Sequence, residues 1–197
     1  IKDFLNQDEF DCNAKAVVST VMLTVTDALS QTDQCTAGVT VQDLIPPVVD
    51  CINDFTINLD DESQMMLSST HFYNTATDNC LPVTVVASED TFTCDDIGTP
   101  VVVNVIATDP SMNTDDCNVT VTVLDTGNPE CELTDGLTFA PLQTIVLADV
   151  LEDYTDNCNE AAAMATITPS SFDCDELGTQ SIVVTVTDDA GNSSTCN

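Results

Sequence analysis

Hydrophobic and polar residues alternate with a period of two along four segments of this chain. In residues 118–123 the valines fall on one face and Asn or Thr on the other, which is the pattern of a half-buried strand. β-Branched residues dominate all four segments, as a pleated surface prefers. The sequence therefore predicts an all-β protein. The four segments are 17–25, 101–106, 118–123 and 181–187.

The ten cysteines recur in four classes at a spacing of about 80 residues. The text around them repeats as well, since FTCDDIGT at 92–99 matches FDCDELGT at 172–179, and TDNC occurs at 77–80 and at 155–158. The chain is therefore an array of repeats. The classes are Cys12, Cys94 and Cys174; Cys35, Cys117 and Cys196; Cys51 and Cys131; Cys80 and Cys158.

Each 80-residue repeat has room for about seven or eight short strands separated by Asp, Asn, Gly and Pro turns, which indicates an immunoglobulin-like (Ig-like) sandwich. Proline-containing linkers at 43–47 and 125–129 mark the boundaries. We predict tandem Ig-like antiparallel β-sandwiches, stapled by disulfides. Residues 1–47 are the C-terminal half of a repeat, 48–127 a complete repeat, and 128–197 a repeat that lacks its last strand.

The missing strands of the two end repeats have two candidate sources. They belong either to neighbouring sequence of a longer polypeptide or to another subunit. We expect the first, because strand donation between subunits is the rarer mechanism, although it is well attested in fibres.

The charge of the chain excludes several partners. The chain has thirty-four acidic residues and only two basic ones, Lys2 and Lys15, which gives a net charge of -32. Nucleic acid and anionic membrane surfaces are therefore not partners. No run approaches the roughly 18 apolar residues that cross a bilayer, so no membrane insertion is expected. Divalent cations would relieve the self-repulsion of such a surface.

The cysteine content, about 5% of residues in fixed register, indicates an oxidising compartment and hence an extracellular, secreted or cell-surface protein. Zinc is disfavoured because there is no CxxC pair and His71 is the only histidine. A single histidine also provides no repeated catalytic base, so we do not expect an enzyme.

Several motifs resemble hyalin repeats, which are extracellular Ig-like modules of adhesive and matrix proteins. The motifs are the IPP linker at 45–47 with Cys51 soon after, the TDNC turn, the Gly98-Thr99 step, and VTDDAGN at 186–192 before Cys196. The chain departs from the pattern at 108–113, where TDPSMN lacks the glycine, and in the second linker, which keeps only Pro129. The resemblance implies a non-catalytic adhesive or scaffolding role.

Disulfide pairing follows from the expected sandwich topology. The first strand of an Ig-like sandwich runs parallel to the last and starts at the same end, so their opening cysteines face each other. We therefore predict Cys51–Cys117 and Cys131–Cys196. The remaining classes would pair locally, as Cys80–Cys94 and Cys158–Cys174. Cys12 and Cys35 are left without partners within the chain.

Asp27, Asp109 and Asp188 occupy one register position at the end of a Val-rich strand. Two interpretations remain open. The aspartates cap hairpin turns by accepting bonds from their own backbone, or they contribute oxygen ligands to Ca²⁺ between repeats. We favour the turn, because no stretch matches a complete EF-hand loop. Asp78 and Asp156 allow the same two interpretations. No cofactor other than Ca²⁺ is expected.

Asn118 and Asn192 begin glycosylation sequons at nearly equivalent positions, so glycans are candidate modifications. We predict a structural protein, a repeat array in a surface fibre, filament or adhesive matrix, whose partners are copies of itself or neighbouring repeats. The alternative is a ligand- or carbohydrate-binding module of a receptor ectodomain or secreted enzyme. That alternative needs exposed aromatics over a groove, for which the chain has Tyr73, Tyr154 and seven phenylalanines.

Overall fold

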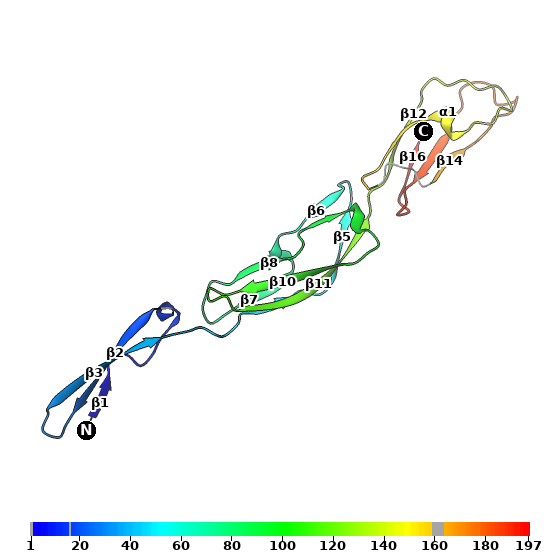
Figure 1. Cartoon of the computed structure of the whole chain (residues 1–197). Helices are drawn as coiled ribbons and strands as arrows, with labels where there is room; N and C mark the ends of the chain where they lie inside the picture. The colour runs from blue at the N-terminus through cyan, green and yellow to red at the C-terminus, as the bar shows by residue number, and fades with distance from the viewer. Residues whose placement is uncertain (1, 16, 159–163) are drawn as a thin grey trace. The chain divides into compact units, whose positions relative to one another are not determined.

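The computed structural model describes residues 2–15, 17–158 and 164–197. They form two compact units, whose boundary runs through the middle repeat; the first contains Ile1–Ile52, Ser69–Ser88 and Asn104–Asn118, and the second Asn53–Ser68, Glu89–Val103 and Val119–Asn197. Nearly all the ordered elements are strands (Figure 1). The strands are β1 (Lys2–Leu5), β2 (Val18–Thr26), β3 (Thr32–Thr40), β4 (Val48–Cys51), β5 (Phe55–Leu59), β6 (Gln64–Met66), β7 (Tyr73–Thr77), β8 (Thr84–Ala87), β9 (Thr91–Thr93), β10 (Val101–Thr108), β11 (Thr114–Asp125), β12 (Glu130–Leu133), β13 (Leu151–Thr155), β14 (Met164–Thr168), β15 (Val183–Thr187) and β16 (Ser193–Cys196). The helices are short: η1 (Cys12–Ala14), η2 (Ser69–His71), η3 (Cys94–Asp96) and α1 (Leu147–Val150).

The middle repeat contains the parallel pairing of an early strand with the last strand that the sequence predicts. One sheet has the order β5-β11-β10-β8, while β4 pairs with β7 and β6 with β9. The early strand β5 runs parallel to the last strand β11, with Ile57 opposite Val123, and the other pairs of this repeat for which a register is given are antiparallel. The parallel contact of an early strand with the last strand is the feature of an Ig-like sandwich on which the disulfide prediction depended.

The core of the middle repeat comes from the alternation seen in the sequence. Val119, Val121 and Val123 of β11 are fully buried, and so are Val103 and Val105 of β10. The residues between them are at least partly exposed. The predicted half-buried strands at 101–106 and 118–123 are therefore confirmed, and the apolar face of each packs inward.

The flanking repeats are smaller. In residues 1–47, β2 is the centre of an antiparallel sheet with the order β1-β2-β3. In residues 128–197, β12 pairs with β13, and β14, β15 and β16 form a second antiparallel sheet. The core of this last repeat is built around four buried residues, Ile145, Val150, Val184 and Val186.

Two disulfides lie within repeats, at the predicted pairs. Cys51 is bonded to Cys117 and Cys131 to Cys196, with Cα–Cα distances of 6.1 and 6.2 Å. In the middle repeat, Cys51 ends β4, the strand that precedes β5, and Cys117 lies in β11, the strand that β5 joins in parallel register. The pairing therefore follows from strand topology, as expected.

The predicted local pairs Cys80–Cys94 and Cys158–Cys174 are wrong, and so is the expectation that Cys12 has no partner in the chain. Cys12 is bonded to Cys80, and Cys94 to Cys158, while Cys35 and Cys174 are free and exposed. Cys80 belongs to the first compact unit, beside the linker that follows β3, whereas Cys94 belongs to the second. Each of these two disulfides lies within one compact unit, and each bonds residues of two consecutive repeats as the sequence predicts the repeats.

Neighbouring valines of β10 provide a matched test of the core. Val103 is fully buried, whereas Val102 is 62% exposed. We expect Val103→Ala to lower the free energy of unfolding by about 2–3 kcal/mol, because it removes two buried methyl groups and leaves a cavity. Val102→Ala should change it by less than about 0.5 kcal/mol. Urea denaturation of both variants measures the difference, and equal effects would contradict the assigned alternation.

Candidate functional site

Two clusters of Asp and Asn residues surround the disulfides that join repeats. The first junction, as we call it, consists of Asp43, Asp78, Asn79, Asp109 and Asn113 around Cys12–Cys80. The second junction consists of Asp125, Asp156, Asn157, Asp188 and Asn192 around Cys94–Cys158. Each member has its counterpart 78 to 82 residues away. The two junctions are therefore built from equivalent residues of successive repeats, and each lies within a single compact unit.

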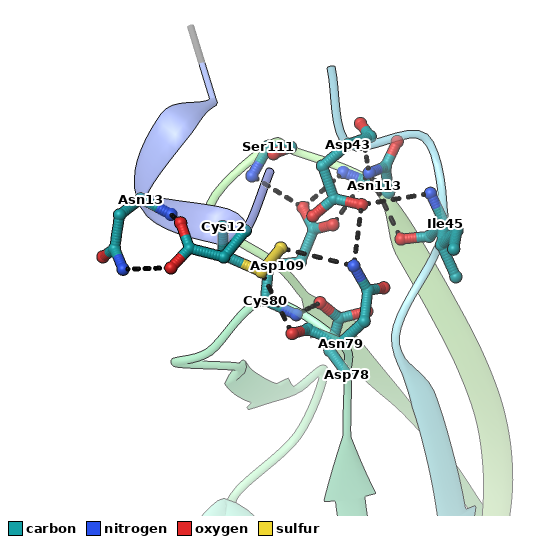
Figure 2. Close-up of a disulfide and its surroundings, with 11 residues drawn as sticks. Cys12, Asn13, Asp43, Ile45, Asp78, Asn79, Cys80, Asp109, Ser111 and Asn113 are labelled. Atoms are coloured by element: carbon teal, nitrogen blue, oxygen red, sulfur yellow. Dashed lines mark hydrogen bonds between the residues drawn. A yellow bond between two sulfur atoms is a disulfide. The ribbon is translucent and has the colours of Figure 1, made fainter. Parts of the chain in front are cut away.

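The first junction is organised by the hairpin between β10 and β11 (Figure 2). Asp109 is only 3% exposed, and its Oδ1 accepts hydrogen bonds from the backbone N–H groups of Ser111 and Asn113, both at 2.8 Å. The side-chain Nδ2 of Asn113 donates to Asp109 Oδ2 at 2.7 Å and to the carbonyl of Asp43 at 3.1 Å. The hairpin therefore holds the linker from the preceding repeat.

The TDNC turn presents Cys80 to the preceding repeat. Asp78 Oδ2 accepts the backbone N–H of Cys80 at 2.6 Å, and Asn79 Nδ2 donates to Asp43 Oδ1 at 3.4 Å. On the other side, η1 begins with a capping bond from the N–H of Asn13 to Asp11 Oδ1. Short polar turns thus fix both cysteines of the disulfide.

Two carboxylate oxygens of the first junction have spare coordinating capacity. In the part of the chain that the structure describes, no hydrogen bond reaches the buried atoms Asp43 Oδ2 and Asp78 Oδ1. Ligand atoms of these two residues lie within 4.8 Å of each other and of the Cys80 sulfur. That sulfur is in a disulfide, so it is not a thiolate ligand. Hard oxygen ligands of this kind fit Ca²⁺.

The first junction also contains a cation of its own. Desolvation alone would raise the pKa of Asp109, but the hydrogen bonds from Asn113 and Ser111, together with the positive charge of Lys15, hold that pKa below its ordinary value. The Lys15 Nζ is buried. Ile97 takes the place of Lys15 at the second junction, because both residues form the same isolated parallel bridge, Lys15 with Val41 and Ile97 with Val123.

The second junction brings three carboxylates together. Oxygens of Asp125, Asp156 and Asp188 lie within 4.8 Å of one another. Asp188 is 3% exposed, and its Oδ1 accepts the N–H groups of Gly191 and Asn192 at 2.6 and 2.8 Å. Asn192 Nδ2 donates to Asp188 Oδ2 at 2.8 Å and to the carbonyl of Asp125 at 3.3 Å. The bonds repeat those of Asn113.

Burial, together with nearby negative charge, raises the pKa of two residues at the second junction, Asp125 and Tyr154. Desolvation, followed by the charges of Asp156 and Asp188, raises the pKa of Asp125 despite its bond from the Gly127 N–H. Burial and the same two carboxylates raise the pKa of Tyr154. A negative potential at the second junction therefore favours any group that brings positive charge.

Gly127 permits a close approach at the second junction. A Cβ atom at this position would overlap the backbone carbonyl of Asp60 and the side-chain oxygen of Asn157. Asn157 Nδ2 in turn donates to the carbonyls of Leu59 and Glu62, both at 3.4 Å. The TDNC turn of the last repeat thus packs directly against the segment that follows β5.

The structure separates the three aspartates that the sequence grouped. All three cap hairpin turns, as the turn interpretation predicts, but only Asp109 and Asp188 lie at junctions. Asp27 is exposed, its Oδ1 accepts the N–H groups of Leu29 and Gln31, and among the described residues it belongs to no cluster with metal-ligand spacing. It is therefore a turn residue.

The sequence interpretation missed Asp43 and Asp125, which bring carboxylates from the linker into each junction. A signal for them existed, because the two aspartates are 82 residues apart and both lie at the end of a repeat: Asp125 is the last residue of β11, and Asp43 follows the end of β3 by three residues.

The two sequons differ in their surroundings. Asn118 is exposed, and its side-chain oxygen accepts a bond from Asn104, so a glycan there stays a prediction. Asn192 is half-buried, and the nitrogen that would carry the sugar donates both bonds described above. Because a glycosylated amide keeps only one N–H, modification of Asn192 would break one contact of the second junction.

No family model and no curated protein sequence matches the chain. Among solved structures, it is similar to extracellular cadherin domains 1–4 of protocadherin gamma B7 (16% identity, TM-score 0.35), covering all of this chain and 66% of that one. It is also similar to PcdhgB3 EC1-4, with 13% identity and a TM-score of 0.37, over 90% of this chain and 55% of that one. A third similar structure is the human desmocollin-1 ectodomain, with 11% identity and a TM-score of 0.29, over 90% of this chain and 43% of that one. At these scores the likeness does not assign a family.

Helices that could span a membrane are absent from the described residues, because none is long and apolar enough.

Asn113 offers a direct test of the first junction. We expect Asn113→Ala to lower the free energy of unfolding by about 1–3 kcal/mol, because it leaves the buried Asp109 Oδ2 and a linker carbonyl without their donor. Asn58→Ala, at an exposed position of β5, is the control and should have a small effect. Denaturation by urea compares the two, and a cost for Asn113 no greater than that for Asn58 would show that the junction bonds contribute nothing.

Proposed function

We propose that this chain is a non-catalytic extracellular structural protein, a repeat array that forms part of a surface fibre, filament or adhesive matrix. Its partners are neighbouring repeats or copies of itself. The disulfides support a location outside the reducing cytosol, and the resemblance of its motifs to hyalin repeats supports an adhesive or scaffolding setting. The structural role is to keep consecutive repeats joined under tension.

The observation that carries this proposal is the overlap of the four disulfide loops. Cys12–Cys80 overlaps Cys51–Cys117, which overlaps Cys94–Cys158, which overlaps Cys131–Cys196. Disulfides within repeats therefore alternate with disulfides between repeats. The alternation creates two independent covalent routes along the chain.

The routes are short. From Cys12 to Cys196 the backbone has 184 residue steps. Through the disulfides, the path needs only the 14 steps from Cys80 to Cys94 and the 27 steps from Cys131 to Cys158, 41 in all. At about 3.5 Å per residue, full extension falls from about 640 Å to about 140 Å. An unfolded repeat would therefore lengthen the array very little.

Force spectroscopy tests this role on the whole chain, held at its two ends. The decisive variant replaces the four cysteines of the within-repeat bonds by serine. With the between-repeat bonds intact, 14 steps from Cys80 to Cys94 and 38 from Cys158 to Cys196 remain, so we expect a contour of about 180 Å between Cys12 and Cys196.

The reduced chain is the control and should extend to about 640 Å. The complementary variant, without the between-repeat bonds, should remain near 190 Å, because 39 steps from Cys12 to Cys51 and 14 from Cys117 to Cys131 remain. A contour well above 500 Å for the first variant would mean that no bond joins the repeats, and the proposal would fail.

We include Ca²⁺ in the proposal, as the ion that neutralises the junctions. Three observations support it: the three converging carboxylates at the second junction, the raised pKa of Asp125, and the unbonded oxygens of Asp43 and Asp78 at the first. In the second junction Asp125, Asp156 and Asp188 would hold the ion, and its positive charge would oppose the burial and the repulsion that together raise the pKa of Asp125.

Replacement of Asp125 should have opposite effects without and with calcium. In chelator, Asp125→Asn removes one of three crowded charges but keeps the acceptor for Gly127, so we expect the thermal midpoint to rise by roughly 1–4 °C, up to about 1 kcal/mol. With Ca²⁺ the parent should gain stability and the variant should lose most of that gain. Asp61→Asn, at an exposed position, is the control for net charge and should behave as the parent does.

The stability effect of Asp125→Asn should depend on pH in a definite direction. Because the folded pKa of Asp125 is raised, the fold favours the protonated group, and ionisation costs stability as the pH rises through that pKa. In chelator, the advantage of Asp125→Asn should therefore be present at neutral pH and vanish below the pKa. A variant that is less stable than the parent in chelator, or that keeps the full calcium response, would remove calcium from the proposal.

A further inference from the structure

Lys15 brings a positive charge to the first junction. It is one of only two basic residues in the chain, the other being Lys2. Lys15 follows Cys12 by three residues, and its backbone forms a parallel bridge with Val41, two residues before Asp43. The bridge therefore holds Lys15 beside the start of the linker, close to the disulfide of the first junction.

The ammonium group of Lys15 is buried, and so are carboxylate oxygens that lack a donor. Among the described residues, no hydrogen bond reaches Lys15 Nζ, Asp43 Oδ2 or Asp78 Oδ1. Desolvation raises the pKa of Asp109, but hydrogen bonds and the positive charge of Lys15 outweigh it and lower that pKa. A buried ammonium needs opposite charge around it. One cation and two free anionic oxygens of the first junction therefore complement one another.

The second junction has an apolar residue where the first has this cation. Ile97 follows Cys94 by three residues and bridges Val123, two residues before Asp125. Three carboxylates offer oxygens within 4.8 Å of one another at the second junction, whereas the corresponding group at the first has two carboxylates and a disulfide sulfur. The second junction therefore gathers more negative charge and receives no compensating charge from the position of Lys15.

We propose that Lys15 is a built-in counter-ion that sets the calcium affinity of the first junction. Its ammonium competes with Ca²⁺ for the oxygens of Asp43 and Asp78, and it is present at every calcium concentration because it belongs to the chain. An ion that enters the first junction is repelled by this charge, whereas Ile97 opposes no ion at the second. The second junction therefore fills at lower calcium. The inference rests on the role of Ca²⁺ in the proposed function.

The two junctions then respond differently when calcium falls. At the first, the carboxylates keep the positive charge of Lys15 beside them. At the second, the repulsion among three carboxylates returns, and the stabilisation that binding of the ion supplies is lost. Both junctions stay covalently joined through their disulfides. Calcium therefore acts on the packing of one junction and leaves the other nearly unchanged.

Calorimetric titration of the whole oxidised chain with CaCl₂ tests the affinities. We expect two classes of site whose dissociation constants differ by about tenfold or more, and Asp125→Asn should remove the tighter class. Lys15→Met should tighten the weaker class by about tenfold. Lys15→Arg, which keeps the charge, and Lys2→Met, which makes the same charge change elsewhere, should leave it as in the parent. Equal affinities in the parent, or an unchanged weaker class in Lys15→Met, would overturn the proposal.

The reciprocal change is made at the second junction. Ile97→Lys should weaken the tighter class by about tenfold, and Asn58→Lys, at an exposed position, is the control. Tb³⁺ takes oxygen sites of Ca²⁺ and emits when a nearby tyrosine is excited. Tyr154 precedes the TDNC turn of the second junction by one residue fewer than a full turn motif, where the first has Ala76, so this emission reports the second junction.

The emission should need more Tb³⁺ in Ile97→Lys, should be lost in Tyr154→Phe, and should be unchanged in Lys15→Met. A titration of Ile97→Lys that coincides with that of the parent would contradict the assigned role of this position.

Thermal unfolding in chelator examines Lys15 without any metal. Lys15→Met should lower the midpoint by about 2–6 °C, because it leaves buried carboxylates without their counter-charge, and Lys2→Met should not. Equal midpoints for these two variants would overturn the counter-ion role. Calcium binding that Asp125→Asn removes and Lys15→Met does not alter would overturn this inference alone. Absence of binding in the parent would overturn it together with the calcium part of the proposed function, and the contour lengths would still test the covalent array.

Discussion

The structure depends on a covalent tie between the second half of one repeat and the first half of the next. Cys12–Cys80 and Cys94–Cys158 bring a short helical turn against a TDNC turn, with Cα–Cα distances of 5.4 and 5.2 Å. The linker and the hairpin then contact each other through the side chains of Asn113 and Asn192, which donate to the linker carbonyls of Asp43 and Asp125. In a chain with a charge of -32, a covalent bond maintains contacts that electrostatic repulsion would otherwise oppose.

Buried aspartates make the packing specific. Asp109 and Asp188 are almost fully buried, yet each satisfies its oxygens with backbone N–H groups of its own hairpin and with one asparagine side chain. The same asparagine reaches a carbonyl of the linker. A turn that is locally complete thereby becomes the contact surface for the adjoining repeat. The two junctions differ in one important residue, since Lys15 supplies positive charge at the first and Ile97 stands in its place at the second.

The positions of the four longest alternating segments, the buried valines of β11 and the two disulfides within repeats could be predicted, because all three follow from local periodicity and from the topology of a single sandwich. The disulfides between repeats could not, because that reasoning treated each repeat as closed and paired the remaining cysteines within it. The number of cysteines does not distinguish pairing within a repeat from pairing between repeats. In both cases the class of Cys12, Cys94 and Cys174 has three members and the class of Cys80 and Cys158 has two, so one cysteine is left over. The available signal was a uniform sequence separation between the two cysteines of each pair. All four bonded pairs are separated by 64 to 68 residues, whereas the wrong local pairs are 14 and 16 apart.

The overlap of the four loops has a consequence for cleavage of the backbone. Every peptide bond between Cys12 and Cys196 lies inside at least one closed loop, and each loop shares residues with the next one. A protease that cuts the chain once anywhere in this span leaves both pieces covalently attached. Fragments separate only after reduction or after cuts at several selected places. A surface exposed to extracellular proteases could therefore accumulate nicks and still hold together.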